Sequence, residues 1–143
     1  MSQPSLLPVL SLVERAHRTF MDALELRLQR RGRRDANAVQ AMIAFHLGDL
    51  ELTVGELTER GLYQGSNVSY NLKGLAAAGY IRQQRDPNDR RAVRVALTDQ
   101  GQALRAEVGE ILAELAAFTD AGALEAEQPL RLLLRGLSEA RSA

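Results

Sequence analysis

The fold of this chain follows from one stretch, residues 86–101, which reads DPNDRRAVRVALTDQG. Pro87 suits the second position of a type I turn, and the Asp86 side chain is placed to bond back to the turn backbone. Residues 93–97 alternate between apolar and other side chains, the period of a strand with one face in a core and one in water. Thr98 then offers an N-cap for a helix. With residues 80–85 as the partner strand, the stretch predicts a β-hairpin with a basic tip, although an ordinary surface hairpin with solvated arginines is the alternative.

Two short helices are predicted ahead of this hairpin. Thr53 and Glu56 form the S/T-x-x-E pattern of a capping box, so a helix should begin at Thr53 and stop near Gly61. A second helix should begin at Ser66, keep one apolar face and end at Gly79. The predicted order is helix, turn, helix, strand, basic tip, strand.

The outward face of the second helix carries short polar groups, a tyrosine and a lysine, namely Asn67, Ser69, Tyr70, Asn71 and Lys73. Asparagine can bond adenine through two hydrogen bonds, serine can bond bases or phosphates, and lysine can bond guanine or the backbone. Asn67, Ser69 and Tyr70 are therefore the leading candidates for reading base edges in the major groove of DNA. A solvated polar face is the alternative.

These residues resemble the multiple-antibiotic-resistance regulator (MarR) family of winged-helix transcription factors, most sharply from Leu52 to Gly101. Residues 89–98, DRRAVRVALT, match the family's D-x-R signature and the run that follows it. The resemblance implies that Asp89 orients Arg91 and that Arg91 enters the minor groove, where a narrow groove's negative potential favours a guanidinium. The chain departs from the pattern of many members at Gly65, Asn67, Tyr70 and Asn71, so the target sequence is not carried over. The predicted DNA-binding residues are Thr53, Ser66, Asn67, Ser69, Tyr70, Lys73, Asp89, Arg90 and Arg91.

Composition bounds the function class. The chain has 143 residues, 45% apolar and 25% charged, with no cysteine and a net charge of 0. The charges are segregated: residues 64–94 hold six basic and two acidic residues, and residues 98–143 hold four basic and eight acidic ones. This polarity directs a phosphate-binding face toward DNA and keeps the acidic end away from it. Lacking a long apolar run or a basic leader, the protein is expected to be cytoplasmic.

Long helices are predicted at both ends, over residues 6–31, 35–47 and 98–118, with a last helix after Pro129. The first has an apolar stripe and ends in the basic run of residues 30–34, which lies either near a DNA backbone or free in solvent. The second should carry Val39, Met42, Ile43 and His46 on one side. The last helix has more leucine than one neighbour can bury, which points to a second subunit. The whole chain, 1–143, is expected to be one domain, mostly α with a small β-wing: a winged helix-turn-helix at 35–97 flanked by dimerisation helices at 1–34 and 98–143.

A homodimer would present two reading helices about one DNA turn apart and would bind a pseudo-palindromic operator. Repression is expected, with activation as the open alternative. Relatives bind small effectors in a cleft, and the resemblance suggests His17, Arg18, Met42 and His46 as effector-binding residues, whereas ordinary half-buried histidines are the plainer interpretation. No cofactor is expected, and no motif of an enzyme was found. The remaining alternative is a winged helix used as a protein-interaction module without specific DNA binding.

Overall fold

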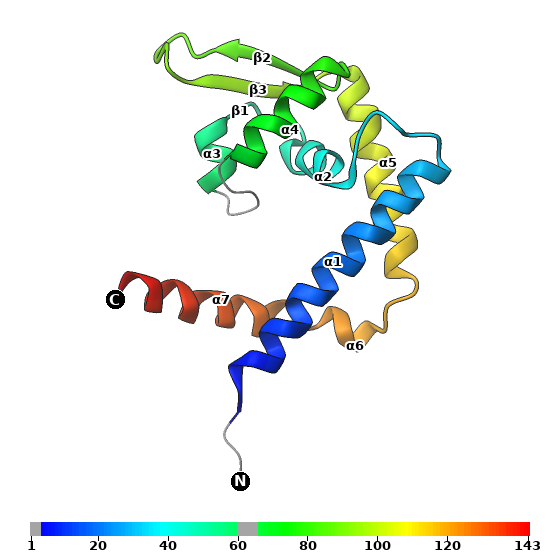
Figure 1. Cartoon of the computed structure of the whole chain (residues 1–143), viewed down its shortest axis with the longest axis vertical. Helices are drawn as coiled ribbons and strands as arrows, with labels where there is room; N and C mark the ends of the chain where they lie inside the picture. The colour runs from blue at the N-terminus through cyan, green and yellow to red at the C-terminus, as the bar shows by residue number, and fades with distance from the viewer. Residues whose placement is uncertain (1–3, 60–65) are drawn as a thin grey trace. The chain divides into compact units, whose positions relative to one another are not determined.

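The computed structural model describes residues 4–59 and 66–143 (Figure 1). Its elements are α1 (Leu6–Arg30), α2 (Ala38–Leu47), β1 (Leu52–Thr53), α3 (Val54–Glu59), α4 (Ser66–Ala77), β2 (Ile81–Arg85), β3 (Val93–Leu97), α5 (Asp99–Ala116), α6 (Ala121–Leu124) and α7 (Glu127–Ser142). The predicted fold class, mostly helical with a small β-wing, is confirmed. The chain divides into two compact units, Met1–Ile111 and Leu112–Ala143.

The first unit begins with α1, whose apolar stripe is buried only at its C-terminal end. Leu24 and Leu28 are fully buried, whereas Val9 and Val13 are 43% and 40% exposed. The helix ends at Arg30, one residue before the predicted boundary, and Gly32 follows with a φ of +83°, a value that suits glycine.

Helix α2 begins at Ala38, so the predicted start at Asp35 was wrong. The Asn37 side chain accepts a hydrogen bond from the Gln40 backbone, and the Gln40 side chain accepts one from the Asn37 backbone. Glu25 of α1 accepts a further bond from the Ala38 N–H at 2.6 Å. These partners satisfy the free donors of the first turn, which fixes the helix start three residues later.

The side of α2 that carries Val39, Met42, Ile43 and His46 is not its most buried side. Val39, Met42 and His46 are only half-buried, and Ile43 alone of the predicted set is fully buried. The buried set is Ala38, Gln40, Ala41, Ile43, Ala44 and Leu47. Alanine has too small a side chain to mark a core face by hydrophobicity, yet it allows α1 and α4 to approach α2 closely.

The three strands form one antiparallel sheet in the order β1, β3, β2. Gln83 pairs with Val95 and Arg85 with Val93 in the hairpin, while Leu52 of β1 pairs with Val95 on the other edge. On β3, Ala96 is buried as well as its neighbours Val95 and Leu97. The prediction that β3 alternates between core and water therefore fails at Ala96.

The end of α4, the start of β2 and the start of α5 pack closely together. Gly79 has a φ of +85° and ends the turn after α4, as predicted. The Thr98 hydroxyl donates to the Gly79 carbonyl at 2.6 Å and accepts from the Gly101 N–H at 3.2 Å, so Thr98 is the N-cap of α5. A side chain at Gly101 would overlap the Tyr80 carbonyl oxygen, which explains the glycine there.

The core of the first unit contains contributions from α1 to α5 and the sheet. Its largest fully buried side chains are Leu24, Leu28, Ile43, Leu47, Leu57, Val68, Leu72, Leu75, Val95, Leu104, Val108 and Ile111. This core holds the helix-turn-helix and the hairpin in one body.

The second unit comprises the end of α5, α6 and α7. Helix α7 begins at Glu127, two residues before Pro129, because proline is tolerated in a first turn, where its missing N–H has no helical partner. Its leucines are largely exposed, with Leu132 and Leu134 both at 66%. None of the described helices combines the length and the apolar composition needed to cross a bilayer.

Candidate nucleic-acid interface

The capping box predicted at α3 is present. The Thr53 hydroxyl accepts from the Glu56 N–H at 3.1 Å, and the Glu56 carboxylate accepts from the Thr53 N–H at 3.2 Å. Thr53 is half-buried and also belongs to β1, so it joins the sheet to the helix-turn-helix. The predicted end near Gly61 lies outside the described residues.

Helix α4 exposes most of the predicted reading face. Val68, Leu72 and Leu75 are buried on one side, and Asn67, Ser69, Tyr70 and Lys73 are exposed, Tyr70 at 73%. The backbone of Ser66 begins the helix as predicted, and its side chain lies outside the described part of the chain. Residues three and four apart share a helix face, so Ser69 and Tyr70 lie beside Lys73.

Asn71 departs from the predicted outward face. It is 8% exposed, and its amide donates to the Asn67 carbonyl at 2.8 Å. The helical position between Val68 and Leu72 turns Asn71 toward the core, and this bond to the carbonyl four residues earlier satisfies its buried amide.

Helices α2 and α4 contact each other, and Gln40 of α2 lies against Gly74 of α4. A Cβ at Gly74 would overlap the Gln40 amide nitrogen, which is the end of a flexible side chain. The oxygen of the same amide closes the capping box of α2.

The wing tip is ordered by two aspartates. Asp86 accepts from the Asn88 N–H at 2.8 Å, as predicted for a turn. Asp89 accepts from the Arg91 N–H at 3.0 Å, so its contact is with the backbone of the arginine two residues on. The Arg90 and Arg91 side chains are both exposed.

Arg94, on β3, is bonded within the hairpin, unlike the exposed Arg90 and Arg91 at the tip. Its Nε donates to the Asp86 carboxylate at 3.1 Å, and the Asp86 side chain is only 10% exposed. The hydrogen bond from the Asn88 backbone and the Arg94 guanidinium together hold the pKa of Asp86 below its usual range. Arg94 therefore neutralises a carboxylate within the hairpin.

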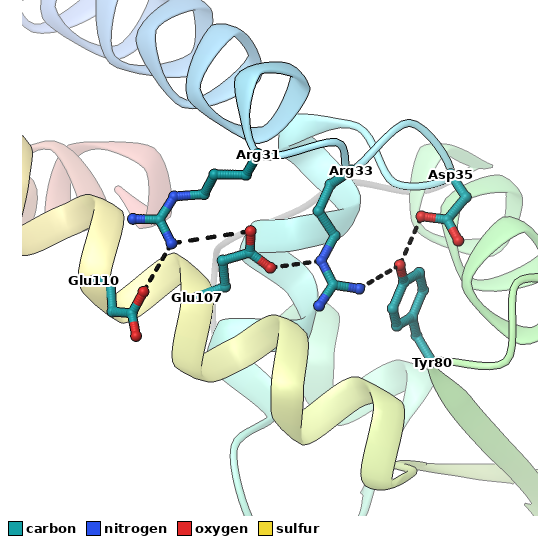
Figure 2. Close-up of polar contacts among 6 residues, drawn as sticks. All are labelled: Arg31, Arg33, Asp35, Tyr80, Glu107 and Glu110. Atoms are coloured by element: carbon teal, nitrogen blue, oxygen red, sulfur yellow. Dashed lines mark hydrogen bonds and ion pairs between the residues drawn. The ribbon is translucent and has the colours of Figure 1, made fainter.

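Two arginines of the basic run of residues 30–34, Arg31 and Arg33, are bonded within the protein (Figure 2). Arg31 lies 2.7 Å from Glu110, and the Arg33 Nε donates to Glu107 at 2.6 Å. Arg33 also donates to the Tyr80 hydroxyl at 2.9 Å, and that hydroxyl donates to Asp35 at 2.6 Å. Free solvation therefore does not describe Arg31 and Arg33, and the contact of this run with a DNA backbone stays a prediction.

This cluster surrounds a pocket of about 420 Å³, lined by Arg31, Gly32, Arg33, Arg34, Asp35, Tyr80 and Glu107. The Glu107 bond raises the pKa of Arg33, and burial raises the pKa of Tyr80. Both groups therefore keep their protons at neutral pH, and the cluster fixes the end of α1 against α5 and the start of β2. Sequence reasoning missed it, since its members are far apart in the chain.

The suggested effector residues lie on two helices. His17 and Arg18 are exposed on α1, and Arg18 lies 3.9 Å from Glu14 and lines a shallow pocket with Arg15, Thr19 and Asp22. Met42 and His46 are half-buried one turn apart on α2, and burial lowers the pKa of His46.

Comparison with known proteins shows which proteins have a similar architecture. The helix-turn-helix with its hairpin is a winged helix, and residues 35–92 match the model of the MarR family. The chain is therefore similar to the MarR family over its winged helix.

A curated relative is 42% identical over 93 residues: the exopolysaccharide II synthesis transcriptional activator ExpG of Rhizobium meliloti (strain 1021). The alignment covers 65% of this chain and 48% of the relative, so the chain spans about half the length of that protein.

Solved structures share the fold over nearly the whole chain. A MarR transcriptional regulator from Methanosarcina mazei Go1 superposes with a TM-score of 0.76 at 19% identity, covering 92% of this chain and 97% of that one. The MepR–DNA complex of S. aureus gives a TM-score of 0.66 at 21% identity, covering 91% and 96%.

Proposed function

We propose that this protein is a cytoplasmic, homodimeric transcription regulator that binds duplex DNA at specific sequences. The observation that carries the proposal is that one compact unit exposes both the polar face of α4 and two arginines at the wing tip. Similarity to MepR, which was solved with DNA, and to ExpG, a transcriptional activator, supports it.

In this proposal α4 reads bases and the wing reads the shape of the neighbouring minor groove. Asn67, Ser69 and Tyr70 face the major groove, with Ser66 and Lys73 at the same face and Thr53 near the phosphates. The side chain of Arg91 enters the minor groove, and its peptide N–H is held by Asp89. Arg90 contacts the DNA backbone beside that groove. The parts involved are residues 35–97 for DNA and residues 1–34 and 98–143 for dimerisation.

The direction of regulation is proposed to be repression, because a protein bound at a promoter blocks polymerase without needing a further surface that contacts the transcription machinery. An effector that favours a dimer whose two α4 helices have the wrong spacing for the operator would release the DNA. The residues proposed to bind the effector are His17, Arg18, Met42 and His46. Since ExpG is an activator, transcription in vitro from a selected promoter is the direct measurement: a rise in transcript on adding the protein would reverse the proposed sense.

The test of DNA binding starts with genomic fragments selected by the purified protein, followed by titrations of the selected duplex and of mixed-sequence duplex. Asn67→Ala should cost about 1–3 kcal/mol on the selected site and little on mixed-sequence DNA, because base contacts alone carry sequence preference. Arg91→Ala should cost about 1–3 kcal/mol on the selected site without changing the fold.

A protein-interaction module without specific DNA binding remains the competing function. Its signature would be failure to enrich any genomic fragment, with equal and weak affinity for both duplexes. Equal losses for Asn67→Ala on both duplexes would instead remove α4 from sequence reading while leaving DNA binding in place.

A further inference from the structure

Strand β2 presents an exposed stretch that neither α4 nor the wing tip accounts for. Its first residue, Ile81, is 4% exposed, and the next four, Arg82, Gln83, Gln84 and Arg85, are all exposed. Strand β2 is at the edge of the sheet, and among the described strands it pairs with β3 alone. Two arginines at opposite ends of this exposed stretch therefore need an explanation.

The register of the hairpin separates these arginines onto opposite faces. Successive strand residues point to opposite sides of a sheet, so Arg85 shares a face with Gln83 and the buried Ile81. Their cross-strand partners on β3 are Val93, Val95 and Leu97. Arg82 and Gln84 belong to the other face, with Ala96 and Arg94 as partners.

The face with Arg85 is the one that the helices cover. Ile81, Val95 and Leu97 on this face are buried, and α2, α3 and α4 all contact the sheet. Figure 1 shows α3 and α4 on one side of the hairpin and the turn projecting past them. Arg85 is the last residue of β2, so it lies on the helix side of the hairpin, between the covered part of the sheet and the tip.

The arginines of the wing differ in how they are neutralised. Arg94, on the outer face, is bonded to Asp86. The side chains of Arg82 and Arg85 form no hydrogen bond or ion pair with any other residue in ranges 4–59 and 66–143, so only the face on which each lies distinguishes them. An exposed guanidinium without a carboxylate partner retains its full attraction for phosphate.

We propose that the helix-facing side of the wing, at Arg85 with Gln83 beside it, binds the DNA backbone between the grooves contacted by α4 and Arg91. The proposal rests on the proposed function and deepens it. A DNA backbone in that position would pass along the face of the hairpin that is turned toward α4. Arg85 is on this face. Arg82, which is at the other end of β2 and on the opposite face, should not reach it.

The experiment compares two arginines on one strand. Affinity for mixed-sequence duplex DNA is measured across a salt series for the wild-type chain, Arg85→Ala and Arg82→Ala. One phosphate contact contributes about 0.9 to the slope of log affinity against log salt. Arg85→Ala should flatten the slope by about that amount and weaken the selected site and mixed-sequence DNA by the same factor, while Arg82→Ala keeps the wild-type slope.

Arg85→Lys supplies the conservative control, because it keeps the charge and should keep the slope. Thermal unfolding of all three variants checks that the exposed strand remains folded. A flattened slope for both alanine variants would overturn the assignment of faces, and an unchanged slope for Arg85→Ala would overturn the site. In either case the wild-type protein still binds DNA. A wild-type chain that binds no DNA at all would contradict the proposed function itself.

Discussion

At the scale of single residues, Tyr80 shows where local sequence patterns stop being informative. Its hydroxyl connects Asp35 and Arg33, and the Arg33 guanidinium carbon lies 5.7 Å from the centre of its ring. Capping residues such as Thr53 and Thr98 were predictable, because their partners are three residues away. The partners of Tyr80 are more than 40 residues away in sequence, so no local period reveals them.

Removing the Tyr80 hydroxyl tests whether this cluster stabilises the fold. Tyr80→Phe should lower the free energy of unfolding by roughly 1–3 kcal/mol, because Asp35 and Arg33 each lose the hydroxyl of a buried side chain as a partner. Tyr70→Phe is the matched control: Tyr70 is 73% exposed, and its change should stay within about 0.5 kcal/mol. Urea denaturation followed by circular dichroism measures both, and equal stabilities of the two variants would show that the cluster contributes nothing to stability.

At the scale of elements, the sequence predicted the hairpin and the helix-turn-helix but missed the shortest pieces. The turn residues, the capping box and the apolar periods of α4 and α5 are all local signals that survive in the fold. Strand β1 has two residues and α6 has four, too few to display a period. The start of α2 was misplaced although Asn37 and Gln40 form a local capping box; the further partner Glu25 comes from another helix, so no local pattern reveals it.

The wing should have a pH dependence of its own through Asp86. Its pKa is lowered in the folded protein, so ionisation of Asp86 stabilises the fold at neutral pH. That contribution is present above the unfolded pKa, near 4 for aspartate, and is lost as pH falls through the lower folded value. Asp86→Asn should therefore be less stable than wild type at pH 7, and the difference should shrink below about pH 4.

Asp49→Asn serves as the control for this pH series. Asp49 also lies 3.2 Å from an arginine, Arg105, but its side chain is 83% exposed, so solvent screens the pair. Urea unfolding of both variants between pH 3 and pH 7 measures the effect. If the gap between wild type and Asp86→Asn were the same at every pH, the carboxylate charge would have no part in holding the wing.

At the scale of the whole molecule, the exposed leucines point beyond a single chain. Leu130, Leu133, Leu134 and Leu137 repeat at the spacing of one helix face on α7, and all retain exposure in the single chain. The first turns of α1 likewise expose Leu6, Val9 and Val13 on the stripe whose later members, Leu24 and Leu28, are buried. Burial of such surfaces in a two-fold dimer would follow the same hydrophobic driving force that forms the core.

Two leucines of α7 allow this dimer to be tested with a matched pair. Leu134 lies on the apolar face and Leu132 on the opposite side, yet both are 66% exposed. Leu134→Glu should weaken self-association by about 100-fold or more, because an unpaired carboxylate in an apolar interface costs several kcal/mol. Leu132→Glu should leave the dimer intact, and both variants should keep the thermal stability of the first unit, whose core neither residue joins.

Sedimentation equilibrium gives the association constants of the two variants. Titration of full and half operators gives the consequence for DNA binding: Leu134→Glu should lose the advantage of the full site, since only a dimer places two α4 helices about one helical turn apart. Equal dimerisation of the two variants would mean that subunits do not meet through this face of α7.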